Sequence, residues 1–425
     1  MFEIAHINGS TLIFSPFANI ETASLGVFIK GGSRYEPTRT RGISHFLEHM
    51  LFKGSKKYSY KQIKQEIEGR GGALNGFTAQ EITGYYAHFL KKNLAPTLDI
   101  LLDMVCSPLL LANEIQKERN VILEEIKMYN DLPSSRVGML LDKMLWSGHP
   151  LGEEIIGEAE TVKAITRSDL DEWQKRFYQP SHMVISCAGN FDPEEIKGLL
   201  LRKIQGPVRS AEIAVKKPAP LSGFHAAVET KKLEQAHFCI GFRGVTQASP
   251  EKFIVELIHV ILGANMSSRL FEEIREKRAL CYEVSTEVRK FRDTGGFIIH
   301  TGLDKRNIDV ALARTLVELK KIKTREVGNK ELSRAKDYLL GQIAMGLERP
   351  QGMMFYTAES FVSLGKIYEF AQIKKEIEKI EPCDIKRVAQ NIFSFGDMCV
   401  SCIVDDEKGV REKIEKVVAP YRHGA

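Results

Sequence analysis

The chain has 425 residues, of which 43% are hydrophobic and 27% are charged. It is too long for one hydrophobic core, so two or more globular domains are expected, and disordered and fibrous proteins are excluded. The 60 basic and 55 acidic residues give a net charge of only +5, and the basic residues occur as scattered pairs such as Lys56-Lys57. We therefore expect no nucleic-acid partner.

The N-terminal segment shows no targeting signal. MFEIAHINGSTLIFSPF (1–17) has an acidic residue near its start and no basic stretch before an apolar run. Because no uninterrupted apolar segment reaches membrane-spanning length, no membrane partner is expected. Seven cysteines, an odd number in a large chain, fit a reducing compartment, so we expect a cytoplasmic protein.

The first half of the chain mixes strand and helix patterns. An extended apolar run at 25–32 predicts a strand, and the segment 39–53 predicts a helix. A strand containing glycine is expected near 71–90, followed by helices at about 93–106 and 113–130.

The second half repeats this order after a segment rich in Pro and Gly at 205–223. A strand is predicted at 236–244, a helix at 249–262, strands near 281–303 and a helix from 307. Asn93, Leu94, Leu98 and Leu102 correspond to Asn307, Ile308, Leu312 and Leu316, at a constant offset of 214 residues.

This correspondence predicts a duplicated α+β unit. We expect two tandem homologous domains, each with a mostly antiparallel mixed sheet packed with helices. The expected division is a first domain at 1–204, a linker at 205–223 and a second domain at 224–425.

The motif with the most specific chemistry is HxxEH in RGISHFLEHMLFKG (41–54). On a helix, His45 and His49 lie on one face, where two imidazoles can hold one Zn²⁺. Glu48 lies beside them as a candidate base, in the arrangement of inverted zincins. The alternative is that both histidines are polar residues at the edge of an amphipathic helix.

Zinc needs a third protein ligand, and NEIQKERNVILEEIKMYN (113–130) offers one. On a helical wheel, Glu118 and Glu125 lie about 20° apart in the middle of the apolar face, whereas Glu124 points toward solvent. A carboxylate in a buried face is unfavourable unless a cation or hydrogen bonds compensate it. Pairing with Lys or Arg is the alternative to a metal.

These residues, together with GGALNGFTAQEITGYY (71–86) and MSSRLFEEIREKRALCYEV (266–284), resemble the insulinase/pitrilysin family of metallopeptidases. The resemblance spans nearly the whole chain. It is sharpest for the branch that contains the β subunit of the mitochondrial processing peptidase and its bacterial relatives. The resemblance implies that each two-domain chain forms half of a clamshell chamber.

The resemblance also implies a role for each site residue. His45, His49 and Glu125 match the zinc ligands, one ion per chain, and Glu48 matches the general base. Glu118 matches an acid that orients a ligand or helps the base. Residues of the second half, Arg275 and Tyr282, match a pair directed toward the substrate carbonyl, and the stretch Asn75, Gly76, Phe77 and Thr78 matches the edge strand that receives the peptide.

The expected function is a zinc-dependent endopeptidase that hydrolyses unfolded or extended peptides, with processing of precursors as one form of it. A non-catalytic peptide-binding or scaffold subunit of a peptidase complex is the alternative, and a zinc hydrolase of other substrates stays open. Since the chamber needs four such domains, we expect a homodimer, or a heterodimer with an inactive homologous subunit. The second half contains no HxxEH motif.

Overall fold

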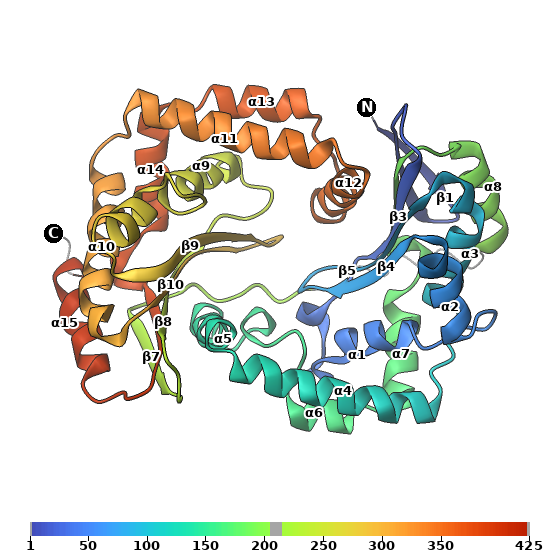
Figure 1. Cartoon of the computed structure of the whole chain (residues 1–425), viewed down its shortest axis with the longest axis horizontal. Helices are drawn as coiled ribbons and strands as arrows, with labels where there is room; N and C mark the ends of the chain where they lie inside the picture. Colours follow the sequence, from blue (N-terminus) through green and yellow to red (C-terminus); the bar gives the residue numbers. More distant parts are fainter. Residues whose placement is uncertain (1, 205–214, 423–425) are drawn as a thin grey trace. The chain divides into compact units, whose positions relative to one another are not determined.

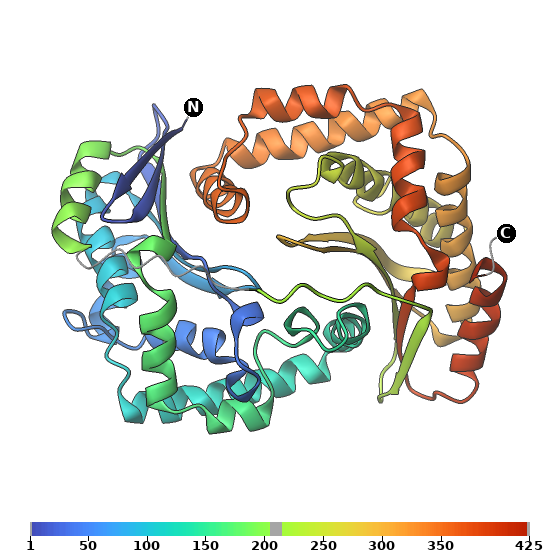
Figure 2. The same ribbon diagram turned by 180° about the vertical axis from the view of Figure 1, so that it is seen from behind.

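The computed structural model describes residues 2–204 and 215–422, which form two compact units. The first unit comprises Met1–Lys127, Glu154–Val215 and Ala344–Glu369, and the second comprises Met128–Glu153, Lys216–Ile343 and Phe370–Ala425. Figures 1 and 2 show the same ribbon from opposite sides. Each unit has one mixed sheet packed with helices, which confirms the expected α+β class.

The sheet of the first unit has six strands in the order β1-β2-β6-β3-β5-β4. Strands β2 and β6 are parallel, and the other neighbours are antiparallel. The strands are β1 (Glu3–Ile7), β2 (Ser10–Pro16), β3 (Thr22–Ile29), β4 (Ala73–Thr78), β5 (Thr83–Leu90) and β6 (Met183–Gly189). The helices that begin in this unit are α1 (Ile43–Leu51), α2 (Tyr60–Ile67), α3 (Leu94–Cys106), α4 (Ala112–Asp131), α6 (Ala159–Ala164), α7 (Arg167–Phe177), α8 (Pro193–Lys203) and α12 (Pro350–Leu364).

The sheet of the second unit has five strands in the order β7-β11-β8-β10-β9, with β7 and β11 parallel. The strands are β7 (His225–Thr230), β8 (Ala236–Gly244), β9 (Cys281–Lys290), β10 (Gly295–Leu303) and β11 (Cys399–Val404). The helices that begin here are α5 (Pro133–Leu145), α9 (Lys252–Leu262), α10 (Ile308–Thr324), α11 (Asn329–Leu347), α13 (Phe370–Glu378), α14 (Pro382–Ile392) and α15 (Val410–Arg422).

The two sheets are copies of one topology. Strands β2, β6, β3, β5 and β4 of the first unit correspond in order to β7, β11, β8, β10 and β9 of the second. Strand β3 begins at Thr22 and β8 at Ala236, while α3 begins at Leu94 and α10 at Ile308, so the predicted offset of 214 residues is confirmed.

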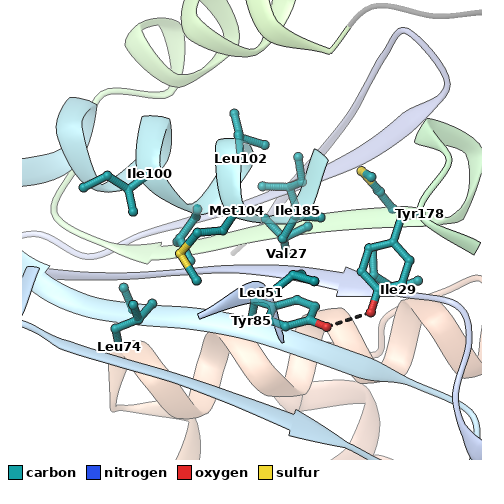
Figure 3. Packing of buried hydrophobic residues seen from close by; sticks show 14 of the residues in the cluster. Val27, Ile29, Leu51, Leu74, Tyr85, Ile100, Leu102, Met104, Tyr178 and Ile185 are labelled. Atoms are coloured by element: carbon teal, nitrogen blue, oxygen red, sulfur yellow. Dashed lines mark hydrogen bonds between the residues drawn. The ribbon is translucent and has the colours of Figure 1, made fainter. Parts of the chain in front are cut away.

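Side chains of β3 alternate between two apolar layers, as the period of a strand requires. Val27 and Ile29 pack into the larger core against α3, whereas Phe28 faces α12 with Met354. Figure 3 shows this larger core, where the hydroxyls of Tyr85 and Tyr178 form a hydrogen bond of 2.6 Å. Because both faces of β3 are covered, its sequence is almost continuously apolar.

Each unit also receives one helix from the other half of the sequence. Helix α5 packs on β8 and β11 of the second sheet, and the equivalent helix α12 packs on β6 and β3 of the first. Figure 1 shows α5 in green beside the second sheet and α12 in orange. The compact units therefore differ in these two segments from the expected division at 1–204 and 224–425. Residues 205–214 of the expected linker lie outside the described residues.

Two predicted elements have different bounds in the structure. The helix expected at 39–53 is shorter, because 38–40 form a 3-10 turn and Gly42 adopts a left-handed conformation at φ 90°. The strand expected near 71–90 is a hairpin of β4 and β5. Within the described residues, the longer helices are all too polar to cross a membrane.

Candidate metal centre

Helix α1 carries both histidines of the motif on one face. The rings of His45 and His49 lie 4.7 Å apart between centroids, as expected for residues one helical turn apart. The opposite face of α1 is buried in the core through Phe46, Leu47 and Met50. The core thus fixes the side of α1 that presents the two imidazoles.

Glu125 of α4 meets this pair. Its Oε2 lies 3.9 Å from Nε2 of His45 and 3.5 Å from Nε2 of His49. One possible ligand atom from each of the three residues lies within 4.8 Å of the others, and all three side chains are only partly exposed. Two imidazoles and one carboxylate form the ligand set of a zinc site with an open position, so the residues present fit zinc.

Glu118 lies two helical turns before Glu125 on α4 and contacts the other ring nitrogen of His49. Its Oε2 lies 3.2 Å from Nδ1 of His49, and its Oε1 lies 2.7 Å from Nζ of Lys53. The carboxylate therefore directs Nε2 of His49 toward Glu125, in the manner of acids that orient metal-bound histidines. Glu118 also pairs with a lysine, the alternative to a metal that its buried position allows, while it contacts His49.

Burial and the neighbouring charges set the protonation of the three candidate ligands. Burial, with a smaller contribution from His49, lowers the pKa of His45 to about 4. Burial alone would lower the pKa of His49, but hydrogen bonds to Glu125 and Glu118 raise it above its usual value. The bond to His49 lowers the pKa of Glu125 despite burial. At neutral pH, His45 is uncharged and Glu125 is ionised, as metal ligation requires, whereas the raised pKa of His49 favours its charged form, which has to lose a proton before it binds a metal.

The side chain of Glu48, on α1, faces β4, the strand at the edge of the sheet. Its Oε2 accepts a hydrogen bond of 2.9 Å from Oγ1 of Thr78, at the end of β4. Burial raises the pKa of Glu48, and the bond from Thr78 opposes that rise. A raised pKa suits a group that takes and returns a proton near neutral pH.

The predicted edge strand, Asn75 to Thr78, is β4, which stands at one end of the six-stranded order. Gly76 lies directly beside Glu48, since a Cβ at this position would be 3.0 Å from Oε1 of Glu48 and from the ring of Phe52. Thr78 was predicted only as a substrate-binding residue. Its bond to Glu48 follows from the packing of α1 against β4.

Sequence reasoning did not identify Arg119, which holds α4 in place. Its guanidinium donates to the carbonyl oxygens of Val162, Lys163 and Ile165 at the end of α6, and it lies 5.4 Å from the ring of Phe46. It therefore links α4, which carries Glu125, to α6 and α1. Only its place next to Glu118 in the sequence pointed to it.

Arg275 and Tyr282 belong to the second unit, and their predicted roles stay predictions. Arg275 lies at the end of a π-helical turn (Phe271–Glu276), 4.7 Å from the ring of Phe271 and 5.6 Å from that of Tyr282. Tyr282 is 73% exposed on β9. Arg275 and Tyr282 thus form a cation–π pair in which the arginine is partly buried and the tyrosine is exposed.

The chain matches two family models. The one described as insulinase (peptidase family M16) covers residues 14–159, and the one described as peptidase M16 inactive domain covers residues 164–339. The chain belongs to the insulinase family, M16. The second model agrees with the lack of an HxxEH motif in the second half, where His259 of α9 instead bonds Thr286 through Nδ1 at 2.6 Å.

Relatives in this family cover almost the whole chain. A Bacillus subtilis protein named uncharacterized zinc protease YmxG is 32% identical over 91% of this chain and 94% of its own length. A Rickettsia felis protein, also named uncharacterized zinc protease, is 31% identical over 91% and 93%. Among solved structures, a Helicobacter pylori protease superposes with a TM-score of 0.90 at 20% identity, over 95% of this chain and 99% of that one, which supports the M16 fold.

Proposed function

We propose that this M16 protein is a zinc-dependent endopeptidase that cleaves unfolded or extended peptides. The observation that carries the proposal is the position of Glu48. This partly buried carboxylate is bonded to Thr78 of the edge strand β4 and lies one residue from His49 of the ligand set. A base, a metal-ligand set and a strand edge therefore meet within one unit.

A zinc ion held by His45, His49 and Glu125 would supply a Lewis acid and lower the pKa of water at the site. Glu48 takes a proton from the attacking water and returns it to the leaving amine. Thr78 holds the carboxylate of Glu48, and Glu118 holds the ring of His49.

Strand β4 would bind the substrate through its free edge. An extended peptide can pair its backbone with an edge strand whatever its sequence, so the strand selects for conformation more than for side chains. This favours segments of unfolded chains, and precursor peptides are the class to test first. We propose a homodimer, or a heterodimer with an inactive homologue, as the working form, in the expected cytoplasmic compartment.

Digestion of a diverse peptide mixture, read by mass spectrometry, tests the proposal. The zinc-loaded protein is expected to cut the peptides, and Glu48→Gln is expected to bind zinc but to reduce cleavage by at least about 10³-fold, because the base is removed. Peptide binding without zinc and without cleavage would favour a non-catalytic subunit. Cleavage by Glu48→Gln at the wild-type rate would contradict the assignment of the base.

A further inference from the structure

The N-terminus of α1 has no capping side chain of its own. Its N-cap residue is Gly42, in a left-handed conformation at φ 90° and ψ 0°. A side chain is excluded there, because a Cβ would lie 2.5 Å from the carbonyl oxygen of Ile156. The first N–H groups of a helix have no partner within the helix, and buried ones need an acceptor from elsewhere.

Glu36, six residues before Gly42, supplies that acceptor. Its Oε2 accepts from the backbone N–H of Gly42 at 2.7 Å, and its Oε1 accepts from that of Ser44 at 2.8 Å. The bond to Ser44, the second residue of α1, is the one that a capping side chain normally makes. The carboxylate also lies at the positive end of the helix dipole, which favours its ionised form, although burial raises its pKa to about 7.

Residues 33–36, the segment that contains Glu36, are hydrogen-bonded to the turn that follows β4. The backbone N–H groups of Ser33 and Arg34 donate to the carbonyl oxygens of Ala79 and Gln80, at 3.2 and 2.9 Å. The buried guanidinium of Arg34 pairs with Glu81. Residues 33–36 thus contact the start of α1 at one end and the turn that follows Thr78 at the other.

Each end of this segment contacts a residue that adjoins the proposed zinc site in the sequence. Ser44 is followed directly by His45, and Ala79 follows Thr78, which holds Glu48. We infer that Glu36 is a positioning residue of the proposed zinc site, which sets the start of α1 relative to β4 so that His45 and Glu48 reach Glu125 and Thr78. The inference rests on the proposed function, although its metal-binding part does not need peptidase activity.

The isosteric variant Glu36→Gln tests this role. Its amide offers one acceptor oxygen instead of two, so either Gly42 or Ser44 faces an NH₂ group and loses its partner. The expected result is a rise of about tenfold in the zinc dissociation constant, measured by competition with a chelator, in line with losses at residues that orient metal ligands. Where the variant cleaves, kcat should fall while KM stays the same, because the edge of β4 is unaltered.

A matched control is Glu318→Gln, which changes another buried acid, on α10 of the second unit, where the carboxylate pairs with Lys321. It should leave zinc affinity unchanged. Glu36→Asp keeps both carboxylate oxygens but is one methylene shorter, so its zinc affinity should fall between those of the wild type and Glu36→Gln. This variant is measured as well, so that a failure of Glu36→Gln to fold leaves a result.

The outcomes separate the two proposals. Wild-type zinc affinity in Glu36→Gln or Glu36→Asp, in a protein that cleaves peptides, overturns the role of Glu36 and leaves the peptidase proposal standing. If zinc affinity is tenfold weaker in Glu36→Gln, and the wild-type protein binds zinc but cuts no peptide, the role of Glu36 is supported and the peptidase proposal is overturned. Faster amide hydrogen exchange at the start of α1 with unchanged zinc affinity shows a purely structural cap, which also overturns the role.

Discussion

Neighbouring glutamates of α4 have opposite environments. Glu125 faces both histidines, whereas the side chain of Glu124 is 72% exposed and pairs with Lys127 one turn away. An exposed pair of this kind contributes little to stability, so Glu124 serves as an inert reference for its neighbour.

We predict that Glu125→Gln weakens zinc binding by at least about 100-fold, because the neutral amide replaces an ionised ligand. Glu124→Gln should leave zinc binding unchanged. Zinc content after dialysis, measured by elemental analysis, checks both. Equal zinc content in the two variants would remove Glu125 from the ligand set.

The hydroxyl of Thr78 acts on the pKa of Glu48. Its hydrogen bond favours the ionised carboxylate, against the burial that raises the pKa. Thr78→Val removes the bond, so the pKa of Glu48 rises further and less base is ionised at a given pH. We predict that the acid limb of the kcat/KM profile moves up by about one pH unit.

The control for this experiment is Thr78→Ser, which keeps the hydroxyl and should keep the wild-type profile. The rate constants are measured across the acid range with one peptide. A valine variant whose acid limb coincides with that of the serine variant would show that Thr78 does not act on the protonation of Glu48.

Because Gly76 has no side chain, the carboxylate of Glu48 can lie next to β4. A methyl group at this position meets Oε1 of Glu48 and the ring of Phe52 at 3.0 Å, so one of them has to move. We predict that Gly76→Ala lowers kcat by about tenfold, equivalent to ~1.4 kcal/mol, with zinc content unchanged. Gly138→Ala on α5, where a Cβ meets no atom within 4 Å, is the control. A normal kcat in Gly76→Ala would mean that the base tolerates displacement.

At the scale of elements, the exchange of α5 and α12 is the feature with most consequences. Helix α5 is attached to the second sheet through buried Leu141 and Leu145, and its Asp142 accepts two hydrogen bonds of 2.6 Å from Arg289. Helix α12 is attached to the first sheet through Met354 and a hydrogen bond of 2.9 Å between Thr357 and Ser186. Each core thus depends on a helix that is distant in sequence from most of its strands.

We predict that Leu141→Ala destabilises the second unit by about 2 to 5 kcal/mol, since it opens a cavity at a fully buried position. Met354→Ala should act on the first unit to a similar extent. Hydrogen exchange read by mass spectrometry distinguishes them, because β8 and β11 exchange faster in the first variant and β3 and β6 in the second. The reverse pattern would contradict the observed packing of these helices.

At the scale of the whole molecule, the chain supplies two copies of one unit. The proposal of a dimer rests on the four such units expected for the chamber, of which one chain provides two. We predict that the protein expressed alone elutes at twice the mass of the chain in size-exclusion chromatography with light scattering. An active monomer would contradict the homodimer, and an inactive monomer activated by an added homologue would favour the heterodimer.

The sequence predicted some elements closely. Strand β8 has the bounds expected at 236–244, because an apolar run that ends at a glycine is a local signal. The hairpin of β4 and β5 was expected as one strand. Its turn lacks glycine and proline, and the backbone bonds from Ser33 and Arg34 to residues 79 and 80 hold it from outside. No local pattern contains such contacts.

The site residues likewise fall into those that the sequence predicts and those that only the fold brings together. The sequence by itself determined the donor types and their faces, His45 with His49 and Glu118 with Glu125, because the spacing of residues on a helix is fixed by its 100° turn per residue. Only the tertiary structure decided that Lys53 pairs with Glu118, that Thr78 bonds Glu48 and that Glu36 caps α1. These partners are brought together by the packing of α1 against β4 and α4, which depends on the whole core.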